Sequence, residues 1–170
     1  MRRYDKHAPD KALADFDKAL ELQPTNATYL VDRGDVQAML GTYDEARADF
    51  DKAIQASPDY DYAYGVRAWI LATTPNDKYR DGKQAIEDAT KACELTQWQN
   101  YSWIENIAAG YAAIGDFEQA IQWQEKAVAL TPQEEQADYE SRLELYRDGQ
   151  PYRDITYAAT NVGSAPKKSE

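Results

Sequence analysis

The stretch DFDKALELQP, residues 15–24, returns almost unchanged as DFDKAIQASP at residues 49–58. The two copies lie 34 residues apart, and so do the prolines that close them, Pro24 and Pro58. Two more distant copies follow, DATKACELT from Asp88 and WQEKAVALTP from Trp123. A fixed period of this length is typical of proteins built from stacked copies of one small structural unit. The sequence therefore predicts a repeat architecture over most of its length.

The sequence of each full repeat predicts two amphipathic helices joined by a turn. In the second repeat we expect the first helix over residues 27–40 and the second over residues 43–56. Gly41 separates them, because glycine tolerates the left-handed conformation at a helix end. The closing proline prevents the second helix from continuing. The fourth repeat copies this arrangement at residues 101–114 and 117–130.

Small residues recur at the positions where two helices must approach closely, with large apolar residues between them. The small residues are Gly34, Ala46 and Ala53 in the second repeat, Ala68, Ala85 and Ala92 in the third, and Ala108, Ala120 and Ala127 in the fourth.

These features resemble the tetratricopeptide repeat family. Its 34-residue pattern has a small residue in the middle of the first helix and Ala-x3-Phe-x2-Ala in the second, followed by proline. The first two repeats match this second half fully, as Ala12-Phe16-Ala19-Pro24 and Ala46-Phe50-Ala53-Pro58. The other two depart from it, as Ala85-Ala89-Ala92-Gln97 and Ala120-Gln124-Ala127-Pro132. The resemblance covers about residues 10–132 and implies an all-α, right-handed superhelical solenoid of antiparallel helix pairs, with about seven helices.

The repeats divide the chain into a domain at residues 1–150 and a C-terminal extension at 151–170. Within the domain we expect a half repeat at 9–24, repeats at 27–58, 61–97 and 101–132, and a capping helix at 133–147. The third repeat carries an insertion at 73–84, which is either a binding loop or a longer tether. The extension lacks helical periodicity, so disorder is expected from about residue 156. Residues 67–96 further resemble repeats common in bacterial proteins.

The composition excludes several classes of function. Thirty Asp and Glu against nineteen Lys and Arg give a net charge of −11, which disfavours nucleic acid because its binding depends on Lys and Arg neutralising phosphates. No run reaches the roughly 18 apolar residues of a membrane span. The N-terminus lacks the apolar region of a secretory signal, so the cytoplasm is the default expectation for a soluble chain.

Few side chains suit catalysis or metal binding. Cys93 and His7 are single, which excludes an internal disulfide and weakens mechanisms that need a second His, Cys or Ser. We therefore expect no enzyme activity, no metal and no cofactor. Cys93 occupies an inward helix position and is expected to act as a small buried apolar residue.

The repeated DFD motif could suggest a cation site. Residues i and i+2 of a helix point apart, so Asp15 and Asp17 cannot chelate one ion together, and neither can Asp49 and Asp51. We expect these aspartates to lie on solvated helix faces.

The resemblance implies a binding groove, because the first helix of each repeat lines the concave side of the superhelix. The groove positions include Asp35, Met39, Tyr62, Trp69, Glu105 and Asn106. An aromatic pair with two carboxylates favours an extended or helical segment that carries apolar and basic side chains. The alternative is that the two aromatic residues merely pack the superhelix. The expected function is non-enzymatic binding of a protein or peptide segment.

Two other functions remain open. The half repeat lacks its first helix, so the apolar stripe of Leu13, Phe16 and Leu20 predicts self-association, as in a structural repeat module. The other possibility is that the chain is the regulatory segment of a larger multidomain protein.

Overall fold

The computed structural model describes residues 9–157, and over this range the chain contains eight α-helices, one short 3₁₀ helix and no strand. The expected all-α solenoid fold is confirmed, with one helix more than the approximate count of seven. The helices are α1 (Pro9–Leu22), α2 (Ala27–Met39), α3 (Tyr43–Ala56), α4 (Asp61–Thr73), α5 (Gly82–Leu95), α6 (Tyr101–Ala113), α7 (Phe117–Leu130) and α8 (Gln136–Arg147), and the 3₁₀ helix is η1 (Ile155–Tyr157).

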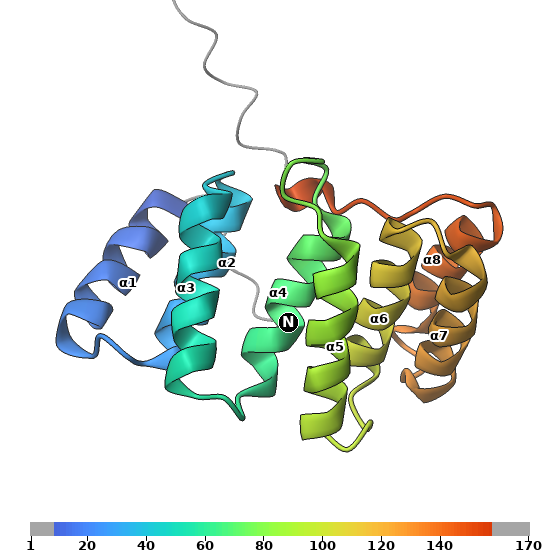
Figure 1. Ribbon diagram of the computed structural model, residues 1–170, viewed down its shortest axis with the longest axis horizontal. Helices are drawn as coiled ribbons and strands as arrows, with labels where there is room; N and C mark the ends of the chain where they lie inside the picture. Colours follow the sequence, from blue (N-terminus) through green and yellow to red (C-terminus); the bar gives the residue numbers. More distant parts are fainter. Residues whose placement is uncertain (1–8, 158–170) are drawn as a thin grey trace, which may run out of the picture.

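Successive helices pack side by side in a row that begins at α1 and ends at α8 (Figure 1). The pairs α2–α3, α4–α5 and α6–α7 correspond to the three full repeats. The first helices of these repeats also touch one another, since α4 packs against both α2 and α6. We call the surface formed by α2, α4 and α6 the A-helix face.

Local sequence signals set the helix ends. The side chains of Asn26, Asp81 and Asp116 each accept a hydrogen bond from the backbone N–H three residues further on, which caps the starts of α2, α5 and α7. Gly41 and Gly115 follow α2 and α6 with φ of 80° and 84°, in the left-handed region that glycine enters without strain. As a result α3 and α7 begin and end where the sequence predicts.

The core is built by small residues on one helix facing large ones on the next. Gly34 of α2 lies against the Phe50 ring, and a Cβ there would approach a ring carbon to 2.8 Å. Gly65 of α4 similarly leaves no space for a Cβ beside the Trp103 ring. All the alanines predicted for such contacts are buried: Ala46, Ala53, Ala68, Ala85, Ala92, Ala108, Ala120 and Ala127. Helices can therefore approach closely enough for dense packing.

The C-terminal end departs from the expected boundaries. Helix α8 begins at Gln136 rather than at 133, because residues 132–135 first form a turn. Beyond α8 the chain turns back toward α4 and α2, and we call residues 151–157 the C-terminal segment (Figure 1). The expected onset of disorder at about 156 falls inside η1, whose last residue is buried. The rest of that prediction, residues 158–170, lies outside the described residues.

Candidate functional site

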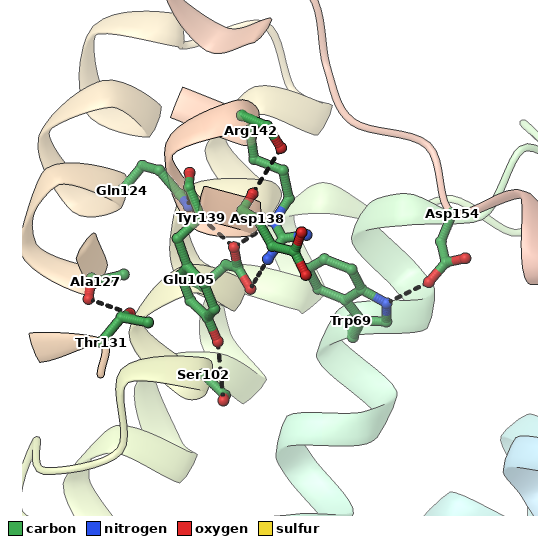
Figure 2. A network of polar contacts seen from close by, with 11 residues as sticks. Trp69, Ser102, Glu105, Gln124, Ala127, Thr131, Asp138, Tyr139, Arg142 and Asp154 are labelled. Atoms are coloured by element: carbon green, nitrogen blue, oxygen red, sulfur yellow. Dashed lines mark hydrogen bonds and ion pairs between the residues drawn. The ribbon is translucent and has the colours of Figure 1, made fainter. Parts of the chain in front are cut away.

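The C-terminal segment lies on the A-helix face at the end of α4. The Asp154 backbone N–H donates a hydrogen bond to the carbonyl of Thr73, at 3.0 Å. The indole N–H of Trp69 donates to the Asp154 carboxylate, also at 3.0 Å (Figure 2). The Tyr152 ring lies against the Trp69 ring, with 5.6 Å between the centroids. Backbone, carboxylate and aromatic contacts together hold the segment to α4.

Tyr157 extends the same contact to α2. Its hydroxyl donates to the Asp35 carboxylate at 3.0 Å, and its backbone carbonyl accepts a hydrogen bond from the Tyr43 hydroxyl at 2.5 Å. The Tyr43 hydroxyl in turn accepts one from the hydroxyl of Thr74. Tyr157 is buried, whereas Ile155 is 73% exposed. The segment is thus anchored on both sides of a residue that points to solvent.

Burial controls the protonation of the Asp35 carboxyl. It raises the pKa of Asp35 from 3.8 to about 6. The hydrogen bond from Tyr157 opposes this rise, and the nearby carboxylates of Asp32 and Asp154 add to it. Burial and the Asp35 charge also raise the pKa of the Tyr157 hydroxyl well above 10, so this hydroxyl remains a donor at neutral pH.

Helix α8 closes the other end of the A-helix face through Arg142. Its guanidinium forms two hydrogen bonds with the Glu105 carboxylate, at 2.5 and 3.2 Å (Figure 2). Gln124 donates to the same carboxylate at 2.9 Å. The guanidinium carbon also lies 4.9 Å from the Tyr139 ring centroid and 5.8 Å from that of Trp69. Arg142 therefore connects α8 to both α6 and α4.

Two of the predicted groove residues are buried and bond to neighbouring helices. Glu105 is only 4% exposed, and burial raises its pKa while Arg142 lowers it. Asn106 is also buried, and its amide donates to the Gly65 carbonyl at 2.8 Å. Their polar atoms therefore stabilise the packing of α4, α6 and α8.

The other predicted groove residues lie nearer the C-terminal segment. Asp35 and Trp69 bond to it directly. Met39 and Tyr62 are half-buried against the core around α2 and α4, and the Tyr62 ring lies 6.1 Å from the Trp103 ring. Contact of any of the six residues with a partner stays a prediction.

Arg33 forms ion pairs that the sequence analysis did not predict. From α2 it makes two hydrogen bonds with Asp49 of α3, at 2.6 and 2.8 Å, and a third with Asp17 of α1 at 2.7 Å. The expectation that the DFD aspartates lie on solvated faces is wrong for Asp49, which is 2% exposed. Burial is tolerated because the bidentate guanidinium neutralises the carboxylate.

The same ion pairs recur one repeat later. Arg67 of α4 makes two hydrogen bonds with Asp88 of α5, both at 2.7 Å, and a third with Asp51 of α3 at 2.5 Å. The signal in the sequence was the shared spacing: Arg33 and Arg67 lie 34 residues apart, as do Asp17 and Asp51.

Comparison with protein families agrees with this repeated structure. Models of the tetratricopeptide repeat match residues 2–61 and 106–134, which together make up just over half of the chain. The chain is a tetratricopeptide repeat (TPR) protein. A search of curated proteins found no match. TPR repeats commonly form protein–protein interaction modules, and TPR proteins are generally non-enzymatic scaffolds.

The TPR domain also has an open apolar pocket of about 480 Å³ between α6 and α7, at the turn after α5. Trp98, 40% exposed, stacks on Trp123 at 5.7 Å, and the Lys126 ammonium lies 3.7 Å from the Trp123 ring centroid. Trp98 has φ of 60°, which is uncommon for a residue other than glycine. Sequence reasoning missed this pocket because Trp98 stands outside the helical periodicity.

The insertion in the third TPR repeat forms a loop over residues 74–81 that folds onto α3. The Tyr79 ring stacks on Tyr43, with 4.6 Å between centroids, and its hydroxyl donates to Asp44 at 3.0 Å. The loop therefore packs against Tyr43, whose hydroxyl donates a hydrogen bond to the backbone carbonyl of Tyr157 in the C-terminal segment.

Helix α1 of the TPR half repeat leaves apolar surface in contact with solvent. Leu20 is buried in the core, whereas Leu13 and Phe16 are half-buried. Leu22, at the end of the helix, is 85% exposed. Self-association through this stripe stays a prediction.

No helix within residues 9–157 has both the length and the apolar character needed to cross a membrane. The same residues contain no group of three or more His, Cys, Asp and Glu side chains placed to hold a metal ion.

Proposed function

We propose that this TPR protein is a non-enzymatic interaction module that binds a segment of another protein on its A-helix face, in the concave groove of the superhelix. The observation that carries the proposal is the C-terminal segment itself. Residues 151–154 lie on this face without regular secondary structure and contact it through main chain and side chains. A surface that accepts one extended segment has the hydrogen-bonding groups to accept another.

Photo-crosslinking with a displayed library of short peptides tests the proposal. A photoreactive phenylalanine analogue replaces Met39, the half-buried last residue of α2. The control places the analogue at Lys52, whose side chain is 61% exposed on α3. We expect peptides enriched on the protein to crosslink at position 39 and not at position 52. Labelling at position 52 alone would contradict the proposed face.

Self-association is a second candidate function, favoured by the exposed Leu22 and the half-buried Leu13 and Phe16 of α1. Burying a leucine or phenylalanine side chain contributes about 1.5–3 kcal/mol, so a few such residues suffice for a weak dimer. Light scattering over a concentration series tests it: the mass should rise above 19.3 kDa, and Phe16→Glu should abolish the rise. The control Lys18→Glu, an exposed change on the same helix, should not. A constant mass would refute this function.

A further inference from the structure

The C-terminal segment shows which chemistry the A-helix face accepts. The Tyr152 ring packs on Trp69, and the Asp154 carboxylate accepts the hydrogen bond from the same indole. The Tyr157 hydroxyl reaches α2, three residues further along the chain. Ile155 is exposed and contributes no contact that specifies sequence. The accepted pattern is an aromatic residue, a carboxylate two residues later and a tyrosine three residues after that.

We propose that the A-helix face recognises a partner segment with this aromatic–acidic–tyrosine pattern, and that the C-terminal segment occupies the same site until the partner displaces it. The inference rests on the proposed function above, and it adds the chemistry of the partner and the competitor built into the chain.

The face supplies polar groups that complement such a segment. Trp69 offers an N–H to the carboxylate, and Asp35 accepts the hydrogen bond of the tyrosine hydroxyl. The Thr73 carbonyl is available because the last carbonyls of a helix have no partner inside it. The Tyr43 hydroxyl binds the backbone carbonyl of the final tyrosine. Two of these four contacts involve the main chain, so the backbone path, which has no regular structure over residues 151–154 and then turns in η1, is part of the recognition.

The contacts of Asp35 and Glu105 within the chain remove the support for the basic segment expected from the sequence. That expectation depended on Asp35 and Glu105. Arg142 neutralises Glu105 within the chain, and Asp35 already accepts a hydrogen bond from a neutral hydroxyl. The hydroxyl of a tyrosine in the partner would therefore supply the hydrogen bond that the Asp35 carboxylate accepts.

Residues 148–150 form a short connection between α8 and the C-terminal segment, so the segment competes with a partner for the A-helix face. A segment held on a short tether has an effective concentration of about millimolar at its own site. A free partner must overcome this concentration, so release of the segment should strengthen partner binding.

The test uses the full chain and a fluorescent peptide with the sequence of residues 150–157 and blocked ends. In the released variant, Asp154→Ala and Tyr157→Ala together remove the two side-chain hydrogen bonds that hold the C-terminal segment to Trp69 and Asp35, and they change no residue of the face. Fluorescence anisotropy should show peptide binding about tenfold or more tighter for this variant than for the wild type. The control Ile155→Ala should bind like the wild type. A peptide with alanine in place of Asp154, which cannot accept the indole hydrogen bond, should bind the released variant about tenfold more weakly.

Circular dichroism tests whether the released variant is folded. If it is unfolded, Tyr157→Phe is used in its place, because this change removes only the hydroxyl that bonds Asp35. The Tyr157→Phe variant should bind the peptide more tightly than the wild type, by a smaller factor. Equal binding of the peptide to a folded variant and to the wild type would overturn the inference. So would equal binding of the alanine peptide and the unchanged peptide to the released variant. If library peptides crosslink to the face while this peptide does not bind, the inference fails and the proposed function stands; if neither binds, both fail.

Discussion

Replacing Arg142 with methionine should destabilise the protein strongly. In the native chain the side chains of Arg142 and Glu105 are 15% and 6% exposed and share two hydrogen bonds. Methionine retains much of the apolar contact with Trp69 and Tyr139 but leaves the buried carboxylate without a counter-charge. Removing one partner of a buried ion pair costs about 3–5 kcal/mol, and we expect a loss in that range.

Urea denaturation followed by circular dichroism measures the change in unfolding free energy. Adding Glu105→Gln to the Arg142→Met variant should recover at least half of the loss, because glutamine carries no charge to bury. The defect of the single variant should also shrink as the pH is lowered, since burial raises the pKa of Glu105 and protonation removes its charge. Arg147→Met is the matched control: this residue is on the same helix, its side chain is 47% exposed, and it pairs with surface glutamates.

The control should change stability by no more than about 1 kcal/mol, as exposed ion pairs do. The reasoning is refuted if Arg142→Met costs as little as the control. It is also refuted if the double variant is as unstable as the single one.

Three further predictions follow from the other buried polar groups. Asp88→Ala should cost about 3 kcal/mol in urea denaturation, because it removes the buried bidentate partner of Arg67 and leaves only the exposed Asp51, whereas Asp51→Ala, whose side chain is 54% exposed, should cost about 1 kcal/mol or less. Because the pKa of Asp35 rises from 3.8 to about 6 on folding, its protonation should stabilise the fold fully below pH 3.8, and this contribution should be lost as the pH rises through about 6. The shift corresponds to about 3 kcal/mol, and Asp35→Asn should flatten this part of the stability profile. Cys93 is buried, which raises its pKa to about 12, so a thiol reagent should modify it only as fast as the protein opens; rapid reaction of the native protein would contradict this.

The elements that were predictable from sequence depend on local signals. Helices α3 and α7 begin two residues after Gly41 and Gly115 and end two residues before Pro58 and Pro132, so their limits are encoded within a few residues. The start of α8 was predicted three residues too early because the turn at 132–135 has no glycine and is composed of residues that a helix also accepts after proline.

The polar contacts of the candidate site were not predictable in this way. The hydrogen bond between Tyr157 and Asp35 joins residues 122 positions apart, and the segment that carries it has no periodicity. The partner of Glu105 is Arg142, which lies on α8, a helix outside the repeats. Repeats predict which helices meet, but they do not predict which charge a non-repeated helix places between them.

Hydrogen exchange of the C-terminal segment tests the central claim most directly, namely that the A-helix face binds an extended segment. The Asp154 N–H, bonded to the Thr73 carbonyl, should exchange more slowly in the protein than in the free peptide of residues 150–157. Saturation with that peptide should bring the exchange of residues 152–157 of the protein toward the free rate, while the ends of α2 and α4 stay protected. Unchanged protection of the segment with the peptide bound would contradict the account, as would exchange of the Asp154 N–H at the free rate from the start.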